Sequence, residues 1–80
     1  KSMIGHLVGA SGAVELAGCV QMIKESFVSP TINLNNPEIE CDLNYVPNKS
    51  IEKEINFVLK NSMGFGGQNT SMILGKYKQI

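Results

Sequence analysis

The stretch Lys1-Ser-Met-Ile-Gly5-His6-Leu-Val-Gly9-Ala-Ser-Gly12-Ala-Val-Glu15 decides how this chain is interpreted. It holds the single histidine of the chain beside a lysine and a glutamate, and its three glycines lead into a very apolar segment. A core segment rarely needs a basic residue, an imidazole and glycines at the start of an apolar helix. A functional site does, so we interpret this stretch as the wall of a site.

The segment that follows predicts a helix over residues 6–25. Its polar residues form a narrow stripe at helical spacing, and most other positions are apolar: the stripe is Ser11, Glu15, Gln21 and Glu25. A helix that is apolar around most of its circumference belongs in a protein interior or a membrane. Because 80 residues cannot cover it on all sides, and because the chain opens on Lys1 inside a motif, we expect a fragment of a larger protein.

The rest of the chain predicts a long loop and then a hairpin. Prolines punctuate residues 26–50 and disfavour helix there, although short extended pieces near 27–32 and 43–46 are expected. The charged residues 51–54 predict a turn. Residues 55–62 and 70–77 favour strands, with Gly64-Phe65-Gly66-Gly67 as the loop between them. The predicted fold class is α/β, in the order site turn, buried helix, long loop and C-terminal β-hairpin.

Composition argues against several functions. Seven lysines balance seven acidic residues, and the absence of arginine disfavours nucleic acid or an anionic membrane as the main partner. Cys19 and Cys41 lack metal-ligand spacing, so we interpret both as structural and expect no metal, although the sequence leaves a disulfide open. The apolar run 13–23 is too short to span a bilayer. The glycines at 5, 9 and 12 match no nucleotide-binding motif.

Each candidate site residue also has a plainer interpretation. A helix start at His6 favours a neutral imidazole that can donate to an oxyanion or accept a proton, but a capping or core histidine is the alternative. Lys1 adds charge to the same cavity or is a surface lysine. Glu15, if buried, needs Lys1 or backbone donors near Asn61 as partners; otherwise it is solvated. The N–H groups of Gly64–Gly67 form an oxyanion hole or an ordinary hairpin loop.

Four motifs together are more specific than any one of them. After Lys1–Glu15 come Pro30-Thr-Ile-Asn-Leu-Asn-Asn-Pro37, Cys41-Asp-Leu-Asn-Tyr-Val-Pro47 and Asn61-Ser-Met-Gly-Phe-Gly-Gly67. Their order and intervals resemble the C-terminal end of the type II, elongating 3-oxoacyl-[acyl-carrier-protein] synthases, over essentially all 80 residues. The resemblance implies the thiolase fold with αβαβα layers. Residues 1–80 would be the incomplete C-terminal part of a ketoacyl synthase catalytic domain.

The resemblance also implies a reaction, a decarboxylative Claisen condensation in fatty acid elongation. Malonyl-carrier protein loses carbon dioxide, and its enolate attacks an acyl group on an upstream cysteine to give 3-oxoacyl-carrier protein. His6 would hydrogen-bond the malonyl thioester carbonyl, and Lys1 would tune the site beside Glu15. Phe65 would supply an oxyanion-hole N–H and a ring that gates the acyl pocket. The supporting residues are Asn61, Gly64, Gly66 and Gly67.

Partners and location follow from the same resemblance. It implies acyl carrier protein with malonyl or acyl groups, and a homodimer of the full-length chain. It implies no cofactor and no metal. The expected compartment is the cytoplasm, or a plastid or mitochondrial matrix for a eukaryotic source.

Several alternatives stay open beside this one. Thiolases share a run like Gly5–Gly12 but carry a catalytic cysteine in the late glycine loop, where this chain has Phe65. Polyketide ketosynthases usually have asparagine at the position of Met3. A non-catalytic subunit of the chain-length-factor kind would lack the upstream cysteine, which lies outside the 80 residues. A free-standing α+β binding module is disfavoured by the apolar helix. Gln68, where threonine is common in the family, leaves the chain-length preference open.

Overall fold

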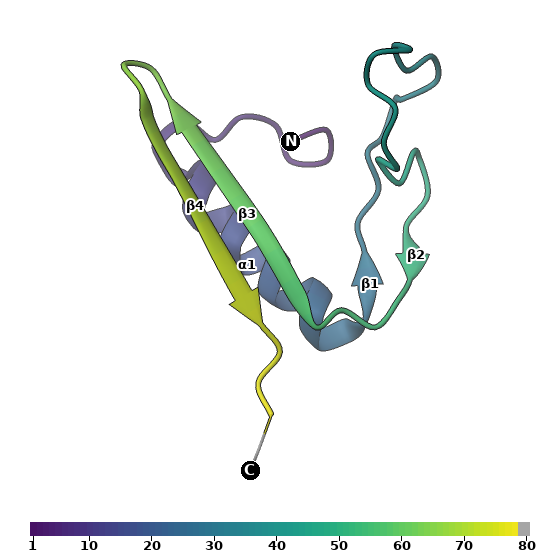
Figure 1. Cartoon of the computed structure of the whole chain (residues 1–80), viewed down its shortest axis with the longest axis vertical. Coiled ribbons are helices and arrows are strands. Elements are labelled where there is room, and N and C mark those ends of the chain that lie inside the picture. The colour runs from purple at the N-terminus through teal and green to yellow at the C-terminus, as the bar shows by residue number, and fades with distance from the viewer. Residues whose placement is uncertain (79–80) are drawn as a thin grey trace.

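A computed structural model describes residues 1–78 (Figure 1). Within them lie one α-helix, a short 3-10 helix and two separate two-stranded antiparallel sheets. The elements in chain order are η1 (Val8–Ala10), α1 (Ser11–Glu25), β1 (Phe27–Val28), β2 (Ile51–Glu52), β3 (Phe57–Gly64) and β4 (Gln68–Gly75). This order confirms the predicted helix, long loop and hairpin of an α/β chain.

The α-helix begins later than the sequence predicts. The expected start at residue 6 is wrong, because Gly5 has φ +75° and Val8 has φ +53°. A β-branched residue in left-handed backbone interrupts a helix, so α1 begins only at Ser11. At the other end, Ser26 also adopts left-handed backbone, and its N–H donates to the carbonyl of Met22. This is a common way for a helix to end.

The hairpin of β3 and β4 is regular along its whole length. The eight residues of each strand pair from Phe57 opposite Gly75 to Gly64 opposite Gln68. The turn between them holds residues 65–67, and both Gly66 and Gly67 have φ +84°. Left-handed backbone at consecutive positions favours glycine, because glycine has no Cβ to clash with the carbonyl. The predicted glycine-rich hairpin loop is therefore confirmed.

The long loop contains a small sheet, of which the sequence predicted one strand and missed the other: β1 lies in the extended piece expected near residues 27–32. The predicted turn at residues 51–54 is wrong at its first two positions, because β2 pairs with β1: Phe27 lies opposite Glu52, and Val28 opposite Ile51. Beyond this pair, Thr31 donates its N–H to the carbonyl of Val46 at 2.9 Å. The charged side chains of this segment favour a turn in the sequence. The strand forms because it pairs with a partner more than twenty residues earlier in the chain. The resulting arm extends away from the β3–β4 hairpin (Figure 1).

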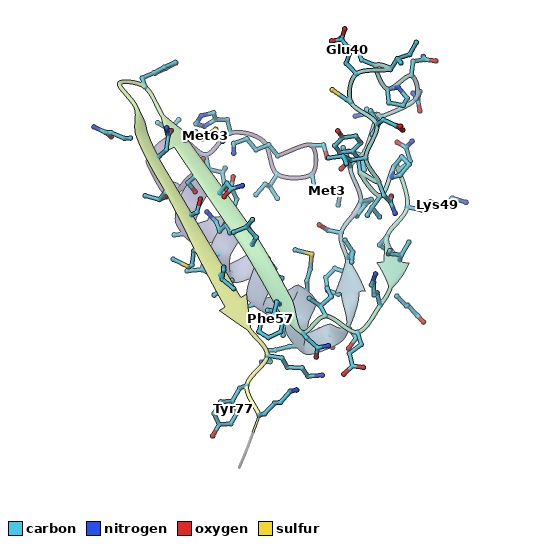
Figure 2. The ribbon with its side chains drawn as sticks, in the orientation of Figure 1. Met3, Glu40, Lys49, Phe57, Met63 and Tyr77 are labelled. Carbon is cyan, nitrogen blue, oxygen red and sulfur yellow. The ribbon has the colours of Figure 1, made fainter. Side chains whose placement is uncertain are left out.

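Helix α1 packs against one face of the hairpin (Figure 1). Alternate residues of β3 are the less exposed ones: Val58, Lys60 and Ser62. The residues between them are exposed, including Phe57 and Met63 (Figure 2). Among residues 1–78 the buried apolar side chains are Cys19 and Ile23. Much of the apolar surface of the helix therefore stays exposed among residues 1–78. This agrees with the prediction that 80 residues cannot cover the helix on all sides.

Candidate functional site

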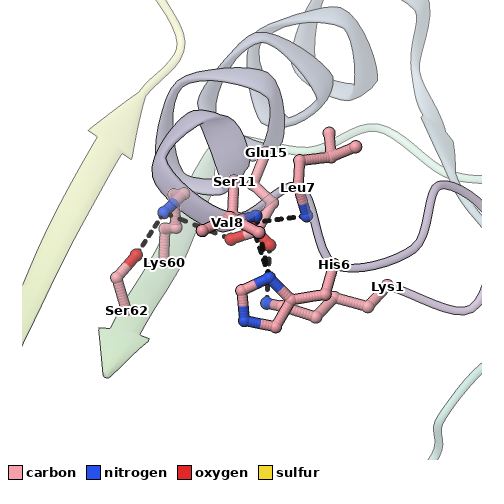
Figure 3. Close-up of polar contacts among 8 residues, drawn as sticks. All are labelled: Lys1, His6, Leu7, Val8, Ser11, Glu15, Lys60 and Ser62. Carbon is pink, nitrogen blue, oxygen red and sulfur yellow. Dashed lines mark hydrogen bonds and ion pairs between the residues drawn. The ribbon is translucent and has the colours of Figure 1, made fainter. Parts of the chain in front are cut away.

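A cavity of about 330 Å³ lies where the N-terminal stretch meets β3. Two segments that are far apart in the sequence line it together. They contribute Lys1, His6, Val8, Ser11, Gly12 and Glu15 from the start of the chain, and Asn61, Ser62 and Met63 from β3. The packing of α1 on the hairpin thus joins the two stretches that the sequence had singled out (Figure 3).

His6 is held in one orientation by its neighbours. Its Nδ1 accepts the backbone N–H of Val8 at 2.9 Å, and the Ser11 hydroxyl oxygen lies 3.4 Å from the same nitrogen (Figure 3). That hydroxyl oxygen in turn accepts the N–H of Leu7 at 2.8 Å. Because Nδ1 acts as an acceptor, the ring is neutral and carries its proton on Nε2. Nε2–H is the ring atom able to donate to a group in the cavity.

The position of His6 relative to the helix differs from the prediction. The sequence placed the imidazole at the helix N-terminus, but α1 begins five positions later, at Ser11. The backbone N–H of Val8, where φ is +53°, is the group that donates to Nδ1 and so leaves Nε2–H as the ring donor. The predicted role of His6 stays a prediction, and its predicted place at the start of the helix was wrong.

Glu15 is the centre of an ion-pair cluster. Its Oε2 accepts Lys1 Nζ at 2.7 Å, and its Oε1 lies 3.5 Å from Lys60 Nζ. The Lys1 hydrogen bond is the main cause that holds the pKa of Glu15 below its usual 4.5, while partial burial opposes it and Lys60 adds to the lowering. Of the partners that the sequence proposed for Glu15, the structure shows Lys1 and not the backbone near Asn61.

Lys60 is the residue that sequence reasoning missed. Its ammonium donates to Ser62 Oγ at 2.6 Å, and only 10% of its side chain is exposed. It lies within residues 55–62, which the sequence predicts as a strand, and alternation along β3 places it on the same face as Val58. That alternation gives the face of the strand but does not show which charge lies opposite. Two lysines against one glutamate leave the cluster with one excess positive charge beside His6.

The hairpin tip is separate from this cavity. Phe65 is fully exposed, and neither it nor Gly66 and Gly67 lines the cavity. Gly64 is the last residue of β3, paired with Gln68. Asn61 does line the cavity, but its Oδ1 accepts the Ser71 hydroxyl at 2.8 Å across the hairpin. The structure therefore joins Lys1, His6, Glu15 and Asn61, and leaves the tip apart.

Other kinds of site are absent from the described part of the chain. Residues 1–78 hold no group of three or more side chains that could bind a metal ion. Cys19 is a buried free thiol and Cys41 an exposed one. No helix among these residues has the length and apolarity needed to cross a membrane.

Comparison with known proteins finds one family model and several similar proteins. Residues 1–35 match the model of the beta-ketoacyl synthase C-terminal domain. Over 78 residues, 98% of the chain, it is 50% identical to 3-oxoacyl-[acyl-carrier-protein] synthase 2 of Synechocystis, and 44% identical to the protein of that name from Staphylococcus aureus. Over 76 residues, the Coxiella burnetii protein is 47% identical. The chain spans 18–19% of the length of these relatives.

Solved structures agree with the sequence matches. One is a type II polyketide ketosynthase in complex with its acyl carrier protein, with TM-score 0.91 and 34% identity. Another is the ishigamide ketosynthase/chain length factor, with TM-score 0.92 and 38% identity. Each likeness covers 95% of this chain and 19% of the other. The chain is therefore similar, over nearly its whole length, to the C-terminal part of the beta-ketoacyl synthases, and it has the thiolase-like fold of that part.

Proposed function

We propose that residues 1–80 form the C-terminal part of a ketoacyl synthase catalytic domain, in a longer polypeptide that condenses malonyl-carrier protein with a cysteine-bound acyl chain. The observation that carries this proposal is the fixed, neutral His6, whose Nε2–H is free to donate beside a cluster with excess positive charge. Relatives of 44–50% identity that are named 3-oxoacyl-[acyl-carrier-protein] synthase 2 support the same assignment.

The geometry suits the decarboxylation step. His6 Nε2–H would donate to the thioester carbonyl oxygen of the malonyl group. As the C–C bond to the carboxylate breaks, its electron pair moves into the enolate and carbon dioxide leaves. A positioned donor stabilises the negative charge that develops on that oxygen. Lys1, in the same cavity wall, adds positive potential to the site.

The condensation step needs a second site. The enolate would attack the acyl thioester on a cysteine outside these 80 residues, and the cysteine thiolate would leave. We propose that the N–H of Phe65 helps to bind the oxyanion formed there, and that its ring gates the acyl pocket. The fully exposed tip supports this role, because a ring without contacts is available to an upstream part of the protein.

The test starts from the purified full-length polypeptide. Its intact mass decides whether residues 1–80 are part of a longer chain: a mass near 9 kDa, the scale of the 8.7 kDa sequence, contradicts the proposal. Decarboxylation is then measured as carbon dioxide released from malonyl-carrier protein. Cysteine acylation is measured separately, by mass spectrometry after addition of acyl-carrier protein. We expect both steps, and their combination to yield 3-oxoacyl-carrier protein.

A second candidate is a polyketide ketosynthase or its chain-length-factor subunit, which both structural neighbours favour. Their identities of 34% and 38% are below the 44–50% of the fatty-acid relatives, so we place this function second. A chain-length-factor subunit would show no cysteine acylation. A polyketide ketosynthase would condense several malonyl units onto an unreduced product, whereas the proposed enzyme would accept saturated acyl chains.

The assembly of the full-length protein belongs to the same proposal. We propose that it acts as a homodimer with acyl carrier protein as its partner, in the cytoplasm or in the plastid or mitochondrial matrix of a eukaryote. The neighbour described as a complex with an acyl carrier protein supports the partner. Sedimentation of the full-length protein with and without carrier protein tests the homodimer and the partner.

A further inference from the structure

We infer that Lys60 is a positioning residue for the proposed condensation: it holds Glu15 from the side opposite Lys1 and so keeps the Lys1 ammonium beside His6. The inference rests on the proposed function of the His6 cavity. Lys60 is not among the residues that line this cavity, so its effect must pass through Glu15.

The contacts divide Glu15 between two lysines. Oε2 accepts Lys1 at 2.7 Å, and Oε1 lies 3.5 Å from Lys60 (Figure 3). The two lysines differ in their surroundings, since 51% of the Lys1 side chain is exposed but only 10% of the Lys60 side chain. Lys60 is fixed further by Ser62, which accepts its ammonium at 2.6 Å. Lys60 is therefore the more buried and more highly bonded lysine of the cluster, and Lys1 is the more exposed one.

The difference in burial between the two lysines explains how Lys60 could position Lys1. An exposed lysine that pairs with a freely rotating carboxylate gains little, because both side chains lose conformational freedom. A carboxylate already held by a half-buried lysine has less freedom to lose when Lys1 binds to it. Removing Lys60 should therefore loosen Lys1, and the site should lose the charge that Lys1 places near His6.

The charged groups around Glu15 predict a second signature. Lys1 faces it from the N-terminal stretch and Lys60 from β3, while the neutral His6 ring lines the same cavity. Both lysines lower the pKa of Glu15, with Lys1 the larger cause. Without Lys60 that pKa should rise toward its usual 4.5, so Glu15 should become protonated at a higher pH than in the wild type.

The experiment compares three variants of the full-length protein. Lys60→Met keeps the length of the side chain without its charge, and Lys60→Arg keeps the charge. The matched control is Lys76→Met, which removes an exposed lysine just beyond β4 that pairs with Glu54 at 3.6 Å. The readouts are kcat and KM for malonyl decarboxylation, the extent of cysteine acylation, the Tm, and the Glu15 titration by carbon-13 NMR with labelled carboxyls, assigned through Glu15→Gln.

We expect Lys60→Met to lower the kcat of decarboxylation by about tenfold, the scale of coupling between contacting residues. Acylation and Tm should be unchanged, and the Glu15 titration should move upward. Lys60→Arg should restore most of the rate, and Lys76→Met should match the wild type. A Lys60→Met variant that matches the Lys76→Met control in rate and in titration overturns the inference. So does a fall in Tm with equal loss of both steps and no recovery in Lys60→Arg, because that pattern marks a purely structural lysine.

Failure of the proposed function gives a different result. If the wild type itself shows neither decarboxylation nor acylation, the condensing activity is wrong, whatever the Lys60 variants do. The Glu15 titration still tests the ionic link in that case. An unshifted titration in Lys60→Met then shows that Lys60 does not hold Glu15.

Discussion

The His6 cavity and the hairpin tip carry the two halves of the expected chemistry, yet they differ in how they are held. His6, Glu15 and Lys60 each contact partners within residues 1–78, through hydrogen bonds or ion pairs of 2.6–3.5 Å. Phe65 is fully exposed, and the nearby glycines shape the turn without touching the cavity. Residues of this chain hold the His6 cavity in place, whereas the hairpin tip has no such contacts among the described residues.

The difference shows which contacts local packing can supply. The cavity forms because α1 packs on the inner face of β3, which is a short-range arrangement of a helix and a hairpin. The tip extends beyond the end of the helix, where no described residue covers it (Figure 1). We therefore expect variants in the cavity to affect decarboxylation, and variants at the tip to affect condensation.

The largest effect is expected for His6→Ala in the full-length protein. Loss of one oxyanion donor costs about a hundredfold to a thousandfold in kcat, so decarboxylation should fall by that factor. Acylation of the cysteine should stay near the wild-type level, because it belongs to the other half of the chemistry. Carbon dioxide release and acyl-enzyme mass measure the two steps. Equal loss of both steps would show that His6 does not act on the malonyl group alone.

A smaller effect on the same side should come from Ser11→Ala. The Ser11 hydroxyl accepts the N–H of Leu7 and lies 3.4 Å from His6 Nδ1, so its loss loosens the ring without removing the donor. We expect decarboxylation to fall by about fivefold, within the range of a single neutral hydrogen bond. Steady-state kinetics at saturating malonyl-carrier protein test this. An effect as large as that of His6→Ala would mean that Ser11 itself contacts the substrate.

The tip can be tested through its backbone. Gly66 has φ +84° and open space around its Cβ position, so Gly66→Ala strains the turn without creating a steric clash. The strain should cost on the order of 1–2 kcal/mol locally. Condensation should fall by about tenfold while decarboxylation is unchanged. Asn69→Ala, an exposed position on the same hairpin, is the control. Equal loss of both steps would remove the distinction between cavity and tip.

The smallest effect is a pH dependence of stability that comes from Glu15. Its folded pKa is lowered, so its contribution is present above the usual 4.5 and is lost as the pH falls through the folded pKa. Glu15→Gln should remove about 1 kcal/mol near neutral pH, and progressively less as the pH falls through the folded pKa. Denaturant unfolding at about pH 7 and about pH 3 measures the difference. An equal loss at both pH values would show that packing, and not charge, explains the contribution of Glu15.

The sequence by itself determined the elements and half of the site. The apolar run up to Glu25 predicted α1, the two β-rich runs around the glycines predicted the hairpin, and His6 with Lys1 and Glu15 marked the cavity. These signals are local, because periodicity and β-propensity act within a few residues of one another. Element boundaries were less well predicted, since the left-handed Val8 delays α1 to Ser11.

Tertiary structure decided the pairings between distant residues. The β1–β2 sheet joins residues more than twenty positions apart, and nothing near Ile51 announces its partner Val28. In the same way, Lys60 looks like a surface lysine in the sequence, and only the packing of α1 on β3 brings it 3.5 Å from Glu15. The burial of Lys60 explains its contacts with Glu15 and Ser62, because a charge withdrawn from water needs an opposite charge or a hydrogen-bond acceptor nearby.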